Sequence, residues 1–283
     1  NLRPVTFRAL GEEGFNRVVL LHDVIQLDHP DYARPDTVPK FCSKFDVALG
    51  AEALIANSEE TGARIAHHAA GAMPFTRVLH LGIETPSVSP PVSHAGPAIF
   101  TALGTIEPRK NHLMLLQLWR QLSSELGDEA PHLHIVGRRG WANSEVFGIL
   151  DADPMMGQTV HYEGSLDDAA TRALLLRSRA LLFPSLAEGF GLPLGEALAM
   201  GVPVLASDLP ALRELGGDVP EWLPPSDQNA WRSAITDFAD QTSALRAAQL
   251  VRLGDWQAPC WDVHFRGVEN LLETIMVQPV NHG

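Results

Sequence analysis

Short apolar runs alternate along the chain with segments whose apolar residues recur at helical spacing. The first run, at residues 17–21, leads into a segment at 36–50 that places its apolar side chains on one helical face. A second run at 53–56 precedes Asn57-Ser58-Glu59-Glu60, which is typical of a helix N-cap followed by acids in the first turn. Strands that alternate with helices predict an α/β protein with parallel sheets.

The alternation restarts after residues 82–97, where the chain is rich in Pro, Ser, Val and Gly and where we expect a linker. Two domains are therefore predicted, at residues 1–88 and 97–262, followed by a helical segment at 263–283. The expected strands cover residues 17–21, 53–56, 77–80, 98–103, 132–136, 159–162, 180–183 and 202–206, and the expected helices cover 36–50, 59–71, 111–126, 143–150, 167–178, a short stretch from 210 and most of the last quarter.

Composition excludes several classes of protein. The chain has 283 residues, of which 45% are hydrophobic and 19% charged, as in a globular protein of one large or two ordinary domains. A net charge of -13 argues against a nucleic-acid partner. No run approaches the roughly 20 apolar residues of a membrane span, and Cys42 and Cys260 offer no disulfide framework. We expect a cytoplasmic protein and leave open peripheral contact with the inner face of the cell membrane.

The strongest chemical signal lies at residues 184–201, directly after the apolar run at 180–183. Gly189 and Gly191 allow the backbone to approach a ligand closely, and a following proline suits the first turn of a helix. The N–H groups at such a helix start favour an anion, for example a phosphate. Glu188 and Glu196 stand eight residues apart around the glycines. Carboxylates that bind hydroxyls beside a phosphate-binding helix start indicate a sugar nucleotide.

Other interpretations of this stretch fit less well. The dinucleotide fingerprint places its glycine turn directly at the strand end, whereas five residues (184–188) intervene here. A dinucleotide-binding site, with Asp208 as the ribose-binding acid, is therefore disfavoured. An ordinary glycine-rich turn would account for Gly201 at a helix C-terminus, but it leaves the pair of glutamates without a reason.

Basic residues follow the first strand after the linker, in Glu107-Pro108-Arg109-Lys110-Asn111. Such side chains at a strand end neutralise a diphosphate, although a solvated pair in a loop is the alternative. We expect no metal. The residues between His22 and His29 do not have the spacing of a zinc site, and the Asp151-Ala-Asp153 triplet is expected in a loop rather than at a strand end.

Taken together, these motifs resemble the signature of the family 4 retaining glycosyltransferases, also called group 1 glycosyltransferases. Among them the chain most resembles bacterial mannosyltransferases of polysaccharide assembly. The matching segments are residues 183–193, Glu196-Ala197, 201–204, 207–214, 104–111, 135–137 and 56–61, with His22-Asp23 at a strand end.

The resemblance implies a GT-B fold, in which two Rossmann-like domains face a cleft. Residues 97–262 would bind the nucleotide-sugar donor, residues 1–88 would lie on the acceptor side, and the segment at 263–283 would return to the first domain. Only 21 residues precede His22. We therefore expect the N-terminal domain to be truncated, without its first βα units and its glycine-rich acceptor loop.

The same resemblance implies roles for individual residues. Glu188 would bind hydroxyls of the transferred sugar, Glu196 would hold the ribose, and His22 would lie beside the donor sugar and the acceptor hydroxyl. Lys110, with Arg109, would offset the charge of the leaving diphosphate. The remaining donor-binding residues would be Thr105 (where many relatives have arginine), Gly137, Gly189, Phe190, Gly191 and Leu192.

The expected reaction moves a hexose, first of all mannose from GDP-mannose, onto a glycan or lipid-linked glycan hydroxyl with retention at the anomeric carbon. A UDP-sugar such as UDP-glucose is the second choice of donor. The nucleotide sugar is a co-substrate, and no cofactor or metal is expected. Two alternatives stay open, namely a non-catalytic nucleotide-sugar-binding fragment or subunit, and a sugar-nucleotide epimerase of the same fold.

Overall fold

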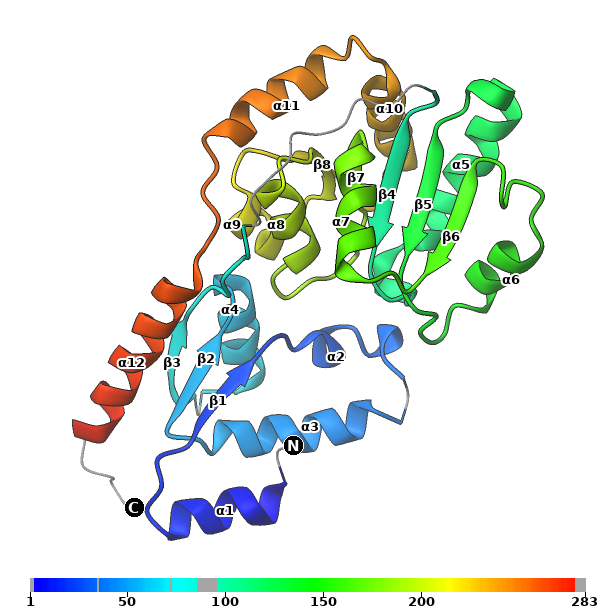
Figure 1. Ribbon diagram of the computed structural model, residues 1–283. Helices are drawn as coiled ribbons and strands as arrows, with labels where there is room; N and C mark the ends of the chain where they lie inside the picture. Colours follow the sequence, from blue (N-terminus) through cyan, green and yellow to red (C-terminus); the bar gives the residue numbers. More distant parts are fainter. Residues whose placement is uncertain (1–2, 35, 72, 86–95, 278–283) are drawn as a thin grey trace. The chain divides into compact units, whose positions relative to one another are not determined.

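The computed structural model describes residues 3–34, 36–71, 73–85 and 96–277, and the chain divides into two compact units (Figure 1). Most of the proline-rich linker segment, residues 86–95, lies outside the described residues, as do the last six residues of the expected C-terminal helical segment. Unit 1 comprises Asn1–Ile83, Glu188–Phe190 and Pro259–Gly283, and unit 2 comprises Glu84–Ala187 and Gly191–Ala258.

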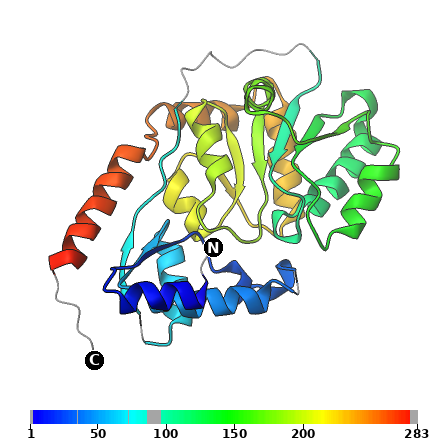
Figure 2. The same ribbon diagram turned by 60° about the horizontal axis from the view of Figure 1, so that its bottom comes forward.

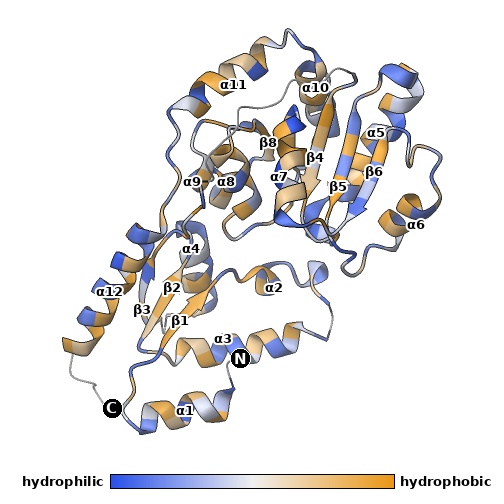
Figure 3. Cartoon of the chain, in the orientation of Figure 1, coloured by the Kyte–Doolittle hydropathy of each residue, from blue (hydrophilic) through white to orange (hydrophobic). Residues whose placement is uncertain are grey.

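Unit 1 is built on a parallel sheet in the order β1-β2-β3. Its central strand β2 is buried along its whole length and is coloured as hydrophobic in Figure 3. One face of β2 packs Leu54 and Ala56 into the core beneath α3 and α4. The other face packs Ala53 and Ile55 against α12. This helix lies alongside the sheet of unit 1 in Figures 1 and 2. The elements are α1 (Pro4–Glu12), β1 (Val18–Leu21), α2 (Ile25–Asp28), α3 (Val38–Leu49), β2 (Ala53–Ala56), α4 (Glu59–His68), β3 (Phe75–Val78) and α12 (Trp261–Val277).

Unit 2 contains a parallel sheet in the order β6-β5-β4-β7-β8-β9. The chain builds outward from β4 to β6, then returns to the other side of β4 and continues to β9, so the strand order reverses between β4 and β7. In open parallel sheets, ligands bind outside the carboxyl ends of the strands at this switch point. The elements are β4 (Ile99–Leu103), α5 (His112–Leu126), β5 (His132–Val136), α6 (Ser144–Ala152), β6 (Val160–Gly164), α7 (Asp168–Arg177), β7 (Ala180–Phe183), α8 (Leu192–Ala199), β8 (Val204–Ser207), α9 (Pro210–Gly216), β9 (Glu221–Leu223), α10 (Gln228–Ala239) and α11 (Ala244–Gly254).

The main core of unit 2 lies on one face of this sheet. Phe100 of β4 meets Trp119 of α5 edge to face, with ring centroids 6.0 Å apart, and Trp231 of α10 is also fully buried. Burying each large side chain of this kind contributes roughly 1.5–3 kcal/mol. On the opposite face the Thr101 hydroxyl lies 2.7 Å from the hydroxyl of Ser178, the C-cap of α7. The sheet is thus covered on both faces, as its strands require.

The elements confirm most of the pattern-based predictions, including the N-cap at Ser58, whose side chain accepts a hydrogen bond from Thr61 N. Several boundaries differ: β3 begins two residues before its predicted start and β8 two residues after, α4 ends three residues before its predicted end, and α12 begins at Trp261. Asp151 was wrongly expected in a loop and lies in the last turn of α6. Within the ranges that the structure describes, no helix combines the length and the apolar character needed to cross a membrane.

Candidate functional site

Two glycine turns lie side by side at the carboxyl ends of β4 and β5. Gly137 has a φ of +156°, and a Cβ atom there would lie 1.9 Å from the carbonyl oxygen of Gly104. Beyond the turn, Ile106 N donates a hydrogen bond of 2.9 Å to Arg138 O. Only glycine fits at position 137, and this fit brings Thr105 and Gly137 together at the end of the sheet.

The side chain of Lys110 lies at the neighbouring strand end. It closes the 3₁₀ turn Pro108–Lys110, and its Nζ is 4.7 Å from the ring centroid of Phe183, the last residue of β7. A Cβ atom on Gly104 would lie 3.3 Å from Lys110 Cε. Glycine at position 104 therefore leaves room for the lysine stem, and the ammonium group lies at the β4–β7 switch point.

Arg109 is held by protein partners on two sides. Its Nε lies 2.8 Å from Oε1 of Glu107, a carboxylate that is buried in the unit. Its Nη1 donates to Ala187 O at 3.1 Å, and its own carbonyl accepts from Leu186 N at 2.7 Å. Arg109 thus braces the segment that leads from β7 to Glu188.

Helix α8 begins at the glycine-rich stretch with its N-terminus unoccupied by a side-chain cap among the described residues. Gly191 is the N-cap with a φ of +96°, and a Cβ atom there would lie 2.4 Å from Leu212 Cδ2. Pro193 lies in the first turn, where it sacrifices no helical hydrogen bond. Leu192, the first helical residue, is exposed. The helix start offers backbone N–H groups to an anion.

A pocket of about 180 Å³ lies in unit 2 beside this helix. Glu196 is exposed overall but lines the pocket, and the pKa of its carboxyl is raised by partial burial and by the negative charges of Asp168 and Glu84. A carboxylate among like charges favours a ligand that donates hydrogen bonds, for example a pair of hydroxyls. The lining residues are Glu84, Leu103, Asp168, Thr171, Arg172, Leu175, Glu196 and Met200.

In unit 1 the structure brings His22 and the first glycine together. The carbonyl of Gly189 accepts hydrogen bonds from Ser58 Oγ at 2.7 Å and from Thr61 Oγ1 at 3.1 Å. A Cβ atom on Gly189 would lie 2.4 Å from His22 O. The ring of Phe190 lies 5.8 Å from that of His80, and the adjacent Glu188 is half-buried. A glycine is required at position 189 because the backbone after β1 passes directly against it.

The other carboxylates weighed in the sequence have structural partners. Asp151 pairs with Arg139, and Asp208 pairs with Arg213. Asp153 accepts from Arg120 at 2.6 Å. In the segment between His22 and His29, Asp28 pairs with Arg64 and lies 2.7 Å from Nε2 of His68. None of these pairs supports a metal or a ribose at those positions.

The sequence alone did not reveal several residues that the structure places at these sites. Asp168, Arg172 and Glu84 line the pocket with Glu196 although they are distant in the chain. Ser58 was expected only as a helix cap, and it also donates to the Gly189 carbonyl. Asp168 carried one usable signal, since acids in the first turn of a helix lie near the end of the preceding strand.

His112, the first residue of α5, makes an acid-sensitive contribution to stability. Burial, and secondarily the charge of Lys110, lower its pKa to about 4. No hydrogen-bond partner for its Nδ1 occurs among the described residues. The imidazole is therefore neutral when folded and takes up a proton more readily when unfolded, so stability is complete above pH 6.5 and is lost as the pH falls toward 4.

We expect the free energy of unfolding to fall by about 2 kcal/mol between pH 7 and pH 5 from this group alone. Urea unfolding at the two pH values measures it. In His112→Gln the free energy of unfolding should differ correspondingly less between pH 7 and pH 5, whatever the absolute stability of the variant. An identical difference in both proteins would contradict the assignment to His112.

Comparison with known proteins identifies the fold. The solved structure of sucrose-phosphate synthase from Thermosynechococcus elongatus matches 96% of this chain and 71% of its own, with a TM-score of 0.71 and 18% identity. The solved structure of Anabaena HepE in complex with UDP and glucose matches 95% of this chain and 74% of its own, with a TM-score of 0.72 and 17% identity. Likenesses at such low identity concern the fold alone, which is the GT-B fold predicted from the sequence.

Sequence comparison identifies the family. O-antigen chain mannosyltransferase B of Escherichia coli is 36% identical over 160 residues, which are 56% of this chain and 42% of that protein. The serotype-specific mannosyltransferase WbdA of Escherichia coli is 35% identical over 147 residues, 46% of this chain and 18% of that protein. The chain thus spans less than half the length of these relatives. The family described as "Glycosyl transferases group 1" matches residues 97–241, about half of the chain, which therefore belongs to the group 1 glycosyltransferases.

Proposed function

We propose that this chain transfers a hexose from a nucleoside-diphosphate sugar to a hydroxyl of a glycan or lipid-linked glycan, with retention at the anomeric carbon. The observation that carries the proposal is the arrangement inside the matched segment. There a lysine lies at the switch point of the sheet, and a glutamate of α8 lines a pocket. A diphosphate needs a cation and a ribose needs a hydroxyl acceptor, and the two side chains supply them.

Mannose is the proposed sugar and GDP-mannose the proposed donor, with UDP-sugars second. Support comes from the functions of the relatives, which include an O-antigen chain mannosyltransferase of Salmonella typhimurium that is 29% identical over 147 residues. The proposed setting is cytoplasmic, with peripheral contact with the membrane if the acceptor is lipid-linked. We also propose that residues 97–262 form the donor-binding domain and residues 1–88 the acceptor-side domain, with the segment 263–283 returning to the latter.

In the proposed mechanism the chain positions the reactants and stabilises the departing diphosphate. Lys110 offsets its charge, and the backbone N–H groups from Gly189 to Leu192 donate to the sugar and the diphosphate, beside Thr105 and Gly137. Glu188 binds sugar hydroxyls, and His22 lies by the donor sugar and the acceptor.

The leaving phosphate oxygen takes the acceptor proton, so no covalent intermediate is needed. Arg109 acts through its brace on the loop as well as through its charge. Positioning and electrostatic stabilisation are the largest sources of catalysis in such reactions.

Titration calorimetry with GDP and UDP, followed by a turnover assay with GDP-mannose and mannose-containing acceptors, tests the function. Release of GDP that depends on an acceptor supports transfer. Binding without turnover favours a donor-binding unit that needs a further partner or segment. Conversion of the sugar nucleotide without any acceptor would indicate an epimerase, and the absence of binding to either nucleotide would refute the donor site.

Glu196→Gln should weaken nucleotide binding without destabilising the fold. The amide keeps the shape but accepts ribose hydrogen bonds less strongly, so we expect Kd to rise by about 10-fold in calorimetry. Because burial, and then repulsion from Asp168 and Glu84, raise the pKa of this carboxyl and so disfavour its charged form, the unfolding temperature should stay the same or rise slightly. A large loss of stability, or an unchanged Kd, would contradict the ribose-binding role.

The pH dependence of binding gives a second measure of the same residue. A carboxyl with a raised pKa takes up a proton at a higher pH than an ordinary glutamate does, and the protonated group is a weaker acceptor. Nucleotide affinity should therefore decrease from pH 7 to pH 5 in the unsubstituted chain and change less in Glu196→Gln. Equal pH profiles in the two proteins would contradict the assignment of the pH dependence to Glu196.

A further inference from the structure

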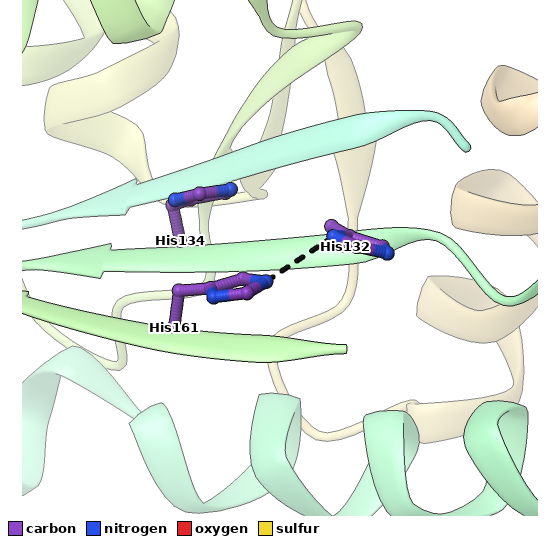
Figure 4. A group of neighbouring side chains, drawn as sticks. All are labelled: His132, His134 and His161. Carbon is purple, nitrogen blue, oxygen red and sulfur yellow. Dashed lines mark hydrogen bonds between the residues drawn. The ribbon is translucent and has the colours of Figure 1, made fainter. Parts of the chain in front are cut away.

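Three histidines gather on β5 and on the edge strand β6 of the unit 2 sheet, and none of them has been given a role above (Figure 4). His132 and His134 are two residues apart on β5, so their side chains leave the same face of the strand. His161 of β6 is the register partner of His134. His134 in turn is the partner of Thr101, whose hydroxyl meets the C-cap of α7. The histidine cluster (His132, His134 and His161) therefore lies on the α7 face, opposite the main core.

The imidazoles are close enough to share one ion. His161 Nε2 lies 3.2 Å from His132 Nδ1, and the rings of His134 and His161 stack with centroids 4.6 Å apart. One ring nitrogen from each residue can be chosen so that all three lie within 4.8 Å of one another. In a tetrahedral site with metal–nitrogen bonds of about 2.0–2.1 Å, neighbouring ligand nitrogens are about 3.3 Å apart. One pair already has this separation, and rotation of the third ring about its side-chain torsions shortens the other distances.

A carboxylate two residues after His161 on β6 supports the cluster. Oε1 of Glu163 lies 2.8 Å from Nδ1 of His134. This bond favours one tautomer, because a carboxylate accepts a hydrogen bond from the protonated Nδ1 and leaves Nε2 unprotonated, with its lone pair available to a metal. Metal-binding histidines are commonly oriented in this way by a carboxylate behind the ring. Two independent features, the convergent nitrogens and the orienting carboxylate, thus occur at the same place.

The cluster is poorly explained by stability alone. All three side chains are half-buried, and aliphatic or aromatic residues would use such positions on a sheet better than three imidazoles. We propose that His132, His134 and His161 bind a divalent transition-metal ion of the zinc class, with Glu163 as the residue that orients His134. Imidazole ligands favour Zn²⁺, Ni²⁺ and Cu²⁺ over Mg²⁺ and Ca²⁺, which prefer oxygen.

This site is separate from the proposed donor site. His132 is the first residue of β5, at the amino end of the strand, whereas Leu103 of the pocket is the last residue of β4. The ion would tie β5 to β6, the edge strand, and stabilise the sheet by binding only the folded chain. Sugar transfer needs no part of it, so the metal site and the proposed function can fail independently.

The test is Zn²⁺ binding to the full chain, prepared without a histidine tag. We expect one ion per chain by equilibrium dialysis with elemental analysis, with a Kd of about 10 μM or tighter. At a hundredfold excess over Kd, the unfolding temperature should rise by about 5–10 °C. Co²⁺ in place of Zn²⁺ should give the visible absorption of a site with nitrogen ligands, and that readout needs no variant.

The matched variants separate this site from adventitious binding. His134→Asn and His161→Asn should each weaken Zn²⁺ binding by about 100-fold, and Glu163→Gln by about 10-fold. His67→Gln serves as the control, since His67 is exposed on α4 in unit 1 and should leave the affinity unchanged. Absence of saturable binding below about 100 μM, or equal affinity in the control and the cluster variants, would overturn the proposal. GDP calorimetry on each variant confirms that unit 2 is folded.

Discussion

Replacing Lys110 by alanine is expected to lower kcat by about 10²–10³, the usual cost of removing one preorganised group that stabilises charge in the transition state. The ammonium lies over the ring of Phe183 at the switch point of the sheet, where a departing diphosphate would develop its charge. Burial of the substrate around the reacting bond strengthens such a contact, because charges interact more strongly where water is excluded. Steady-state turnover with the preferred nucleotide sugar measures the effect.

Two controls make this result specific. Lys110→Arg keeps the charge and should retain more activity than the alanine variant, although its planar group changes the geometry. Lys40→Ala removes an exposed lysine of α3 that pairs with Asp36 one turn earlier, and it should leave kcat unchanged. Loss of the cation–π contact should cost Lys110→Ala only about 0.5–2 kcal/mol of stability. Turnover of Lys110→Ala within threefold of the unsubstituted chain would exclude the proposed role.

The same residue predicts a selective effect on binding. Because Lys110 is assigned to the diphosphate, Lys110→Ala should weaken binding of GDP more than binding of guanosine. Glu196→Gln should weaken both ligands alike, since both carry the ribose. Calorimetry therefore separates the two side chains even before an acceptor is identified.

Sequence reasoning succeeded where one local pattern decides the structure. Strands such as β2 and β7 are buried on both sides, so their apolar runs have no other explanation. It missed α1, a helix of nine residues in which none is buried, although Phe7 packs against the core of unit 1. It missed α2 and β9 because four and three residues are too few to establish a period.

For the candidate site, the sequence likewise predicts the residues that are close together in the chain but not those that folding brings together. Glu188, Glu196 and the glycines between them are close in the chain and form a motif that can be recognised. The neighbourhood of Glu196 depends on Asp168 and Glu84, which come from other segments. The histidine cluster depends on the register of β5 against β6. The sequence shows that His132 and His134 alternate along one strand, but it does not show which strand pairs with theirs or that His161 lies beside them.

Gly189→Ala is expected to lower the rate of transfer severely and to destabilise unit 1, although it adds a single methyl group. The new Cβ would lie 2.4 Å from the carbonyl oxygen of His22 and 2.8 Å from Cβ of Asp23. The first of these neighbours is backbone, which cannot rotate away. Either the chain after β1 or the loop itself must move, and the hydrogen bonds from Ser58 and Thr61 to the Gly189 carbonyl would be strained. Overpacking of this kind costs roughly 2–3 kcal/mol.

Thermal unfolding should show the midpoint lowered by about 5–10 °C, and kcat/KM should fall by more than about 100-fold. The activity loss should exceed the loss of folded protein, because a displaced loop carries Glu188 and the N–H groups before α8 with it. Gly148→Ala provides the control. It adds the same methyl in the middle of α6 with nothing within 4 Å and should stabilise the helix slightly. If Gly189→Ala unfolds at the same temperature and turns over at the same rate as Gly148→Ala, then close packing at His22 is not what position 189 requires.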